Sequence, residues 1–384
     1  MSEAGKAKIY IVIGEESGDQ LGAQVVKALR RIAGDHFEFD GLAGERMQKE
    51  GLHSLFPLSD IAVMGIVNII QQYPSLHRRG MEVVHDIIAK KPDLLLIIDS
   101  PEFTHAVAKR VRKQMPDLPI IDYVSPSVWA WRPGRAKKMA AYVDHVLALL
   151  PFEVQAHKEL SGPPCSYVGH PLIERLDVLR PSEGERGDLS HPVLLVLPGS
   201  RRSEVSRLMV EFGKVVAKAK ERYPDLRVIL PAVSHLRGLI NEGLEGWTVK
   251  PDVVEGEEAK FAAFRQAHAA LAASGTVTLE LGLAGVPMVV AYKVDWITRQ
   301  FKWLLRAHSI VLTNLVLGHN AIPEFIDDAA DADTLADHLL PLLEDGAPRF
   351  QQLSALLELD KAMQLPEGTP SEAAARIVLD NLPK

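Results

Sequence analysis

Residues 193–205, Val-Leu-Leu-Val-Leu-Pro-Gly-Ser-Arg-Arg-Ser-Glu-Val, contain the pattern that decides the fold. Five apolar residues form a run of strand length, Pro198 and Gly199 end it, and a helix-like stretch follows. The same order of short apolar run, turn and longer helix-like stretch recurs along the chain. Alternation of this kind is typical of parallel sheets joined by crossover helices, so the sequence predicts an α/β protein.

The apolar runs fall into two groups separated by a turn-rich, polar stretch at residues 162–187, which indicates a domain boundary near residue 170. We therefore expect a first domain over residues 1–170 and a second over 171–384. Each domain is predicted to be a doubly wound, Rossmann-like sheet, and the two to face each other across a cleft, with ligands beyond the carboxyl ends of the strands. The predicted strands are Ile9–Ile13, Leu94–Ile98, Ile120–Val124 and Val146–Leu150 in the first domain, and Val193–Leu197, Arg227–Pro231, His268–Ala272 and Met288–Ala291 in the second.

The composition is that of a globular protein with a large core, because 47% of the 384 residues are hydrophobic and the net charge is −7. The single cysteine, Cys165, excludes an internal disulfide framework and a cysteine-based zinc cluster. No histidine spacing indicates a metal site, and Asp331-Ala-Asp333 is interpreted as the capped start of a helix, so neither metal nor cofactor is expected. The absence of a secretory signal and of any apolar run approaching ~18 residues predicts a cytoplasmic protein that does not span a membrane.

Positive charge gathers in the first half of the chain. Residues 61–140 contain 12 Lys and Arg against 7 Asp and Glu, a surface that attracts anions. Within this region residues 61–70 are almost wholly apolar, and a buried strand or helix is the default interpretation. The alternative is an interfacial segment that dips into a lipid surface, formed by Ile66, Val67, Ile69, Ile70 and the cations Arg78 and Arg79.

Two strand ends of the second domain carry residues suited to a nucleotide. After Val193–Leu197, Gly199 and Ser200 leave the backbone accessible and Arg201 supplies a guanidinium group for phosphate. After the His268–Ala272 strand, Ser274, Gly275 and Thr276 open a helix whose N–H groups suit a phosphate. Glu280 follows one turn later, the distance from a diphosphate to a ribose, although an ordinary acid in a helix first turn is the alternative.

The first domain offers two further loops. Gly14 to Gly22 forms a glycine-spaced turn containing Ser17, Gly18 and Asp19, which matches neither a dinucleotide nor an ATP-binding motif. Asp99 ends the Leu94–Ile98 strand, and Ser100 with Pro101 already forms an N-cap and first helical position. We therefore expect Asp99 to be free to act as a catalytic base, the alternative being an acceptor for loop N–H groups.

A third loop, residues 123–135, brings Trp129 and a second tryptophan together with two arginines, a combination suited to a sugar that bears a phosphate. Single-stranded nucleic acid uses similar chemistry. The neutral charge of residues 1–170 and the lack of spaced aromatics elsewhere argue against a nucleic-acid partner.

Taken together, these motifs closely resemble the lipid-A-disaccharide synthase family from about residue 9 to 326. The residues that carry the resemblance are Gly14–Asp19, Asp99–Phe103, Tyr123–Trp131, Leu150–Glu153, Gly169–Pro171, Leu197–Arg201, Ala273–Thr276 and Glu280. Asn314 resembles a family position lining the cleft, and Glu324 follows in a Pro-Glu-Phe segment. Two residues depart from the family pattern: Glu16 replaces a more usual alanine and Asp327 a more usual glutamine.

The resemblance implies an inverting glycosyltransferase of the GT-B fold, in which the last helix commonly crosses back to the first domain. It implies UDP-2,3-diacylglucosamine as donor, held mainly by the second domain, and 2,3-diacylglucosamine 1-phosphate as acceptor. It implies a β-1,6-linked disaccharide and UDP as products, and a peripheral location on the inner membrane of a Gram-negative bacterium, and leaves oligomerisation open. In this interpretation Asp99 is the base, Arg201 and Ser274–Thr276 stabilise the leaving group, Glu280 holds the ribose, and Ser17 and Asp19 lie on the acceptor side. Two alternatives stay open: another GT-B enzyme that uses a UDP-amino sugar, such as a peptidoglycan glycosyltransferase or a UDP-sugar 2-epimerase, and a non-catalytic nucleotide-binding protein of the membrane surface.

Overall fold

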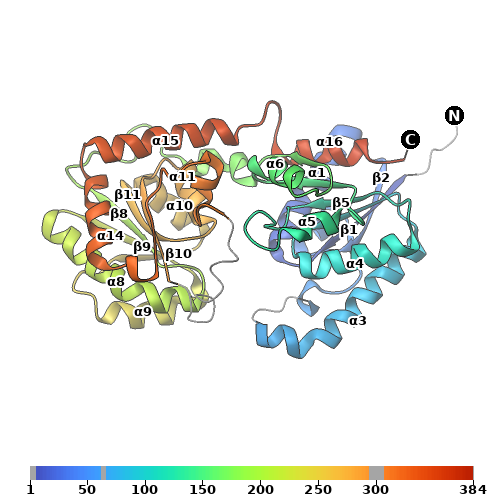
Figure 1. Cartoon of the computed structure of the whole chain (residues 1–384), viewed down its shortest axis with the longest axis horizontal. Helices are drawn as coiled ribbons and strands as arrows, with labels where there is room; N and C mark the ends of the chain where they lie inside the picture. The colour runs from blue at the N-terminus through green and yellow to red at the C-terminus, as the bar shows by residue number, and fades with distance from the viewer. Residues whose placement is uncertain (1–5, 62–65, 294–306, 384) are drawn as a thin grey trace. The chain divides into compact units, whose positions relative to one another are not determined.

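The computed structural model describes residues 6–61, 66–293 and 307–383, with the backbone alone for residues 66–73. The chain forms two compact α/β units (Figure 1). Unit 1 comprises Met1–Pro171 and Leu365–Lys384, and unit 2 comprises Leu172–Gln364. Each unit is built on one parallel sheet, so the predicted fold class of two doubly wound domains is confirmed.

The sheet of unit 1 has 7 strands in the order β3-β2-β1-β4-β5-β6-β7, all parallel. The chain builds outward from β1 on one side and from β4 on the other, so the β1/β4 boundary is the topological switch point at which such sheets bind ligands. Ile13 pairs with Ile98, so both central strands end at the same level. The strands are β1 Ala7–Ile13, β2 Phe37–Leu42, β3 His53–Ser54, β4 Leu94–Ile98, β5 Ile120–Tyr123, β6 His145–Ala148 and β7 Cys165–Tyr167.

Unit 2 repeats this plan with 6 parallel strands in the order β10-β9-β8-β11-β12-β13. The switch point lies between β8 and β11, where Leu197 pairs with Ala272. The strands are β8 Val193–Leu197, β9 Arg227–Ala232, β10 Asp252–Glu255, β11 Ala269–Ala273, β12 Met288–Tyr292 and β13 Glu324–Ile326.

Helices connect the strands of both sheets. In unit 1 they are α1 Glu16–Ala33, α2 Glu45–Lys49, α3 Ile66–Lys90, α4 Pro101–Gln114, α5 Gly134–Met139, α6 Phe152–Glu159 and α16 Pro370–Asp380. In unit 2 they are α7 Leu176–Leu179, α8 Arg202–Arg222, α9 Arg237–Glu245, α10 Glu257–Gln266, α11 Val277–Leu283, α13 Leu312–Leu317, α14 Ala332–Leu339 and α15 Ala347–Met363. Short 3₁₀ turns occupy η1 Leu58–Asp60, η2 Pro171–Arg175, η3 Ser234–Leu236, η5 Asp327–Ala329 and η6 Leu340–Leu343.

All eight predicted strands are present. The predicted bounds of β4 and β8 are those observed, and β6 is shifted toward its N-terminus. β5 ends one residue early because Val124 has φ +81, a conformation that no strand residue adopts. The remaining strands β2, β3, β7, β10 and β13 were not predicted.

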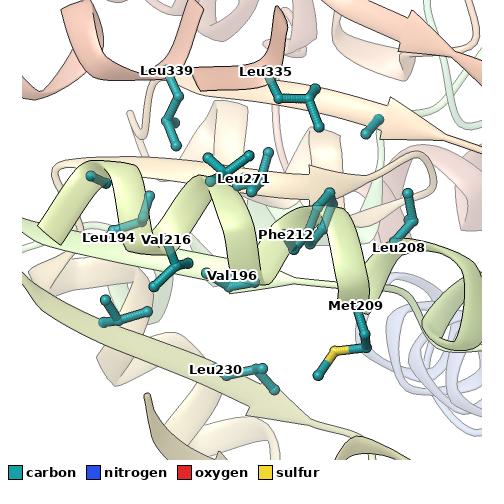
Figure 2. Close-up of a cluster of buried hydrophobic side chains, with 14 of the residues drawn as sticks. Leu194, Val196, Leu208, Met209, Phe212, Val216, Leu230, Leu271, Leu335 and Leu339 are labelled. Carbon is teal, nitrogen blue, oxygen red and sulfur yellow. The ribbon is translucent and has the colours of Figure 1, made fainter. Parts of the chain in front are cut away.

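The core of unit 2 lies between its sheet and the helices that cover it (Figure 2). Leu208, Phe212 and Val216 recur at helical spacing along α8 and pack over the central strands β8 and β11. Leu335 and Leu339 of α14 complete the same cluster. Burying one such side chain contributes about 1.5–3 kcal/mol, so this layer fixes the strands whose ends form the site.

The last helix of the chain packs in unit 1. Ala374 and Val378 of α16 are buried in one cluster with Val25 and Leu29 of α1. A capping box formed by Thr369 and Glu372 begins α16. The sequence left open whether the final helices return to the first domain; α16 does so, whereas α15 stays with unit 2.

Asp19 links α1 to the turn that follows β2. Its side chain is 3% exposed, and its carboxylate accepts the backbone N–H groups of Gly44 (2.9 Å), Arg46 (2.8 Å) and Met47 (3.1 Å). These donors belong to the start of α2, where a helix has no partners of its own. Asp19 therefore caps α2 from a neighbouring element and holds the β1–α1 loop against it.

We predict that Asp19→Ala lowers the free energy of unfolding by about 2 kcal/mol, because three backbone donors, two of them buried, lose their charged acceptor. Urea unfolding followed by circular dichroism measures the change. Asp35→Ala is the matched control, because its side chain is 79% exposed and its cationic partners lie 3.8 Å away. An unchanged midpoint in Asp19→Ala would contradict the capping role.

Candidate functional site

Unit 2 contains a pocket of about 510 Å³ at the carboxyl ends of its central strands. It lies at the switch point between β8 and β11. The volume lies within the range typical of small-molecule sites. The seven residues singled out in the second-domain motifs are brought together here: Gly199, Ser200, Arg201, Ser274, Gly275, Thr276 and Glu280.

The loop after β8 is organised by a buried carboxylate. Gly199 has φ +116, and a Cβ there would lie 2.5 Å from an oxygen of Glu204. Glu204 accepts the backbone N–H groups of Ser200 (3.1 Å) and Arg201 (3.2 Å). It also pairs with the Arg201 guanidinium at 2.9 Å. These two backbone N–H groups are therefore not free for a phosphate in this structure, because Glu204 already accepts them.

Arg201 nevertheless remains available to a ligand. Its side chain is 74% exposed, whereas that of Glu204 is 6% exposed. The buried carboxylate thus holds one nitrogen of the guanidinium, and Arg201 also lines the pocket. Arg201 is a pre-oriented cation, which favours recognition of a phosphate oxygen pair.

The loop after β11 forms a second wall of the pocket. The Ser274 hydroxyl donates to the carbonyl of Ile310 at 2.6 Å, which ties the loop to the start of α13. Gly275 has φ +155 and is exposed, and a Cβ there would meet open space. The loop therefore presents backbone and no bulky side chain, and a ligand can approach it closely.

Glu280 is paired with a cation that sequence reasoning missed. Lys260 Nζ lies 3.0 and 2.9 Å from the two carboxylate oxygens of Glu280. The Lys260 amine also lies 4.7 Å from the ring centre of Phe261, which fixes the side chain from the other side. The two partners are 20 residues apart on α10 and α11, and no local motif connects them. Glu280 is thereby held in one orientation.

In unit 1, Asp99 stands at the β1/β4 switch point. Its carboxylate accepts the hydroxyl of Ser17 at 2.9 Å and the backbone N–H of Ser100 at 2.7 Å. Ser17 lies exposed in the first turn of α1. The two loops that were singled out in the first domain therefore meet through this one hydrogen bond.

The backbone at Asp99 is strained. Asp99 has φ +56 and Ser100 has φ +46, so two consecutive residues with side chains adopt the left-handed conformation. Such residues cost about 1–3 kcal/mol each and gather at functional sites. Gly14 makes room for this turn, because a Cβ there would lie 2.2 Å from Cβ of Ser100. The strain is an observation that points to Asp99 independently of its chemistry.

Ser100 is the N-cap residue of α4 and Pro101 opens the helix, as predicted. The side chain of Ser100, however, makes no capping bond. Its hydroxyl is buried and has no hydrogen-bond partner within the part of the chain that the structure describes. The left-handed backbone of Ser100 explains this, because a capping side chain normally projects from an extended residue.

Two other predicted contact residues of the first loop have structural roles instead. The carboxylate oxygens of Asp19 accept backbone N–H groups at the start of α2, as described above. Gly18 is buried, and a Cβ there would lie 3.2 Å from Ile13 and 3.3 Å from the carbonyl of Ile98. Gly18 therefore allows α1 to pack closely on β1 and β4. Ser17 is the exposed member of the three.

Trp129 is held by a buried carboxyl group. Its indole N–H donates to Glu153 at 3.1 Å, and its ring meets that of Phe152 edge-on at 5.1 Å. The second oxygen of Glu153 accepts the backbone N–H of Leu150 at 3.0 Å. Burial raises the pKa of Glu153 to about 7. Trp129 therefore anchors its loop, and the exposed tryptophan is Trp131, with 46% of its surface accessible.

Asn314 is also a structural residue. It is fully buried, and its amide forms two hydrogen bonds with the backbone of Ile322 at 2.8 and 2.9 Å. In this structure the Asn314 side chain therefore holds the backbone that precedes β13. Glu324 likewise accepts from Ser309 and from the backbone of Ile310.

The two residues that depart from the family pattern lie in different surroundings. Asp327 is buried and has φ +57. Glu16 is exposed at the start of α1.

The structure describes only part of the predicted membrane segment. The side chains of Ile66, Val67, Ile69 and Ile70 lie outside the described residues. Arg78 is exposed, whereas Arg79 pairs with Asp60 and Glu82 and covers the ring of Phe56 at 4.6 Å. Arg79 is therefore tied into unit 1 and is not a free surface cation. None of the described helices is long and apolar enough to cross a membrane.

No group of three or more His, Cys, Asp or Glu side chains within residues 6–61, 66–293 and 307–383 is placed to hold a metal ion. Asp331 accepts the backbone N–H groups of Asp333 and Thr334, each at 3.0 Å. Its interpretation as a helix cap is confirmed.

Comparison with known proteins gives a consistent result. The family model described as lipid-A-disaccharide synthetase matches residues 9–378. A lipid-A-disaccharide synthase from Nitrobacter hamburgensis is 49% identical over 381 residues, covering 98% of this chain and 96% of the relative.

Solved structures share the fold at low sequence identity. UDP-GlcNAc 2-epimerase from Neisseria meningitidis, bound to UDP-GlcNAc, has a TM-score of 0.59 at 14% identity and covers 97% of this chain and 98% of its own. The glycotransferase of kitacinnamycin has a TM-score of 0.60 at 14% identity, with 98% and 100% covered. At this identity the likeness concerns the fold alone.

The buried carboxyl of Glu153 generates a testable pH dependence. A glutamate in the unfolded chain has its ordinary pKa of 4.5, whereas burial raises the folded value to about 7. Between these values the folded state binds the extra proton, so this group's contribution to stability falls as pH rises toward 7 and then levels off. Comparing Glu153→Gln with wild type by urea unfolding at pH 5 and pH 8 should show a shallower decline in the variant, by about 2–3 kcal/mol. Glu159→Gln, an exposed position on α6, is the control. Parallel profiles for wild type and Glu153→Gln would contradict the assignment.

Proposed function

We propose that this glycosyltransferase transfers an acylated glucosamine from UDP to a second acylated glucosamine, because the chain belongs to the lipid-A-disaccharide synthetase family. The donor is UDP-2,3-diacylglucosamine, the acceptor is 2,3-diacylglucosamine 1-phosphate, and the products are a β-1,6-linked disaccharide and UDP. The observation that carries the proposal is the family match over residues 9–378.

The pocket of unit 2 is proposed to hold the UDP part of the donor. Arg201, oriented by Glu204, faces one side of it, and the exposed backbone of Gly275 faces another. Both features suit a diphosphate, the first through charge and the second through close approach. The Glu280 carboxylate, fixed by Lys260, suits the two hydroxyls of a ribose.

Asp99 is proposed as the general base. The donor is α-linked and the product is β-linked, so a single displacement with inversion suffices and no covalent intermediate on the protein is needed. The attacking sugar hydroxyl must lose its proton as the new bond forms, and a carboxylate at a switch point is suited to take it. The Ser17 hydroxyl, donating to Asp99 at 2.9 Å, keeps the carboxylate oriented.

The departing group is UDP, so negative charge develops on the diphosphate as the glycosidic bond breaks. Arg201 and the Ser274–Thr276 loop are proposed to stabilise this charge. Preorganised cations and dipoles need no rearrangement during the reaction, which is why such groups lower the barrier effectively.

A peripheral location on the inner membrane of a Gram-negative bacterium is also proposed. The support is chemical, because both substrates carry acyl chains that reside in a bilayer. Exposed Arg78 belongs to the region of positive charge at residues 61–140, which attracts anionic lipid.

We predict that Glu280→Gln raises the dissociation constant of UDP about 5- to 30-fold, because a charge-assisted bond to ribose becomes a neutral one at a cost of about 1–2 kcal/mol. Isothermal titration calorimetry measures it. Glu358→Gln, exposed on α15, removes the same charge away from the pocket and should bind UDP as wild type does. An unaltered affinity in Glu280→Gln would remove the ribose assignment.

We predict that Asp99→Asn lowers the single-turnover rate about 10²- to 10⁴-fold, because the amide cannot take the proton. UDP affinity and melting temperature should change little. If Asp99 served only the fold, stability would fall first, and activity would fall only with the folded fraction. Normal turnover per folded Asp99→Asn molecule would exclude Asp99 as the base.

A further inference from the structure

Three cations of unit 1 gather near Glu102 in the first turn of α4, and they come from α4 itself, from α5 and from the loop before α5. We call Lys109, Arg132 and Arg135 the α4 cation cluster. Arg135 forms a hydrogen-bonded ion pair with Glu102, and Arg132 lies 3.8 Å from the same carboxylate oxygen. Lys109 follows Glu102 by seven residues, two turns along the same helix face.

Positive charge at this cluster exceeds negative charge. The pKa of Lys109 is lowered by burial and by neighbouring cations, whereas the nearby Glu102 carboxylate raises it. An added anion would therefore be stabilised here. The cations that lower the pKa of Lys109 are Arg135, Lys138 and Arg110.

Glu102 is a replaceable partner. Its side chain is 75% exposed, so its carboxylate can move into water at little cost when another anion takes its place. A phosphate monoester carries more charge than a carboxylate and has three acceptor oxygens. Guanidinium groups match such an anion with paired hydrogen bonds, so phosphate should displace Glu102 from Arg132 and Arg135.

The position of the cluster matches the proposed reaction. Glu102 follows Asp99 by three residues, in the first turn of α4. The exposed ring of Trp131 lies beside it, with the Arg132 guanidinium 4.2 Å from the ring centre. An aromatic face next to cations suits a sugar bearing an anionic group. A hexose whose attacking hydroxyl lies at Asp99 would direct the substituent of its opposite end along this face.

We infer that the α4 cation cluster binds the phosphate monoester of the acceptor sugar, and that Glu102 occupies this anion site when the acceptor is absent. The inference rests on the proposed function, because Asp99 as the base fixes the other end of the acceptor. It adds the residues that select a phosphorylated acceptor over an unphosphorylated one.

The test compares two acceptors, 2,3-diacylglucosamine 1-phosphate and the same lipid without phosphate, in uncharged detergent micelles. Lys109→Met and Arg132→Gln each remove one cation and keep most of the side chain. Both should raise KM for the phosphorylated acceptor roughly tenfold or more, with kcat little changed and with KM for the other acceptor unaffected. Glu102→Gln should lower KM for the phosphorylated acceptor, because the competing anion is gone.

Lys113→Met is the matched control. Lys113 is exposed on α4, one turn beyond Lys109, so the variant has the same change in net charge. Its KM values should equal those of wild type. Equal losses for both acceptors, equal losses in Lys113→Met, or a higher KM in Glu102→Gln would each overturn the inference. Circular dichroism melting of every variant separates loss of binding from loss of fold.

Anionic headgroups share the chemistry of the acceptor phosphate, and a second arm separates the two. Adding phosphatidylglycerol to the micelles should leave the effects of Lys109→Met and Arg132→Gln in place. Effects that appear only with phosphatidylglycerol would mean that the cluster binds the membrane, and would overturn the inference. Binding of both acceptors to each variant is measured by calorimetry in parallel. If Lys109→Met and Arg132→Gln weaken binding of the phosphorylated acceptor alone, the inference is supported even when no sugar is transferred. Failure of the proposed reaction is thus distinguished from failure of the inference.

Discussion

Burial of the central strands on both faces is the constraint on which the rest of this molecule depends. Every residue of β4 and β11 is at most 1% exposed, and β8 is nearly as well covered. Only the last residues of a strand, such as Leu197 and Ala273, reach the pocket, and the polar groups of the pocket come from the loops that follow the strands. Asp99, Gly199 and Ser274 each lie within two residues of a central strand's carboxyl end. The candidate ligand-binding groups of both units therefore lie in a few short loops.

Because the loops lie close together at the strand ends, the conformation of one loop depends on its neighbour. Ile13 and Ile98 are paired, so the turns after β1 and β4 leave the sheet at the same level and compete for one space. Because Gly14 has no side chain, Ser100 can pack against it in its left-handed conformation. The Ser17 hydroxyl donates to Asp99 across the same two turns. Any side chain at Gly14 would displace the turn that carries Asp99, although Gly14 itself has no chemical function.

The fold could be predicted where the sequence pattern is local. Leu94–Ile98 and Val193–Leu197 are five apolar residues between polar or turn residues, and their bounds are those observed. Phe37–Leu42 was missed because Glu38 and Asp40 interrupt its apolar residues in a strand nearer the sheet edge. The site was less predictable, because a polar residue in a loop does not reveal its partner. Asp19 and Asn314 carry the right chemistry but are consumed by backbone groups, whereas Lys260 has no motif and reaches the site only through packing.

Burial decides what the carboxylates beside the cations do. Glu204 and Glu280 have side chains 6% and 15% exposed, and each holds a cation of the unit 2 pocket. Removing the cation would leave a buried carboxylate without its charged partner, so these carboxylates stay in place and orient Arg201 and Lys260. Glu102 makes the same kind of contact with Arg135, but its side chain is 75% exposed and loses little when the pair opens. The first two carboxylates are therefore fixed parts of a binding frame, whereas the third can exchange with an incoming anion.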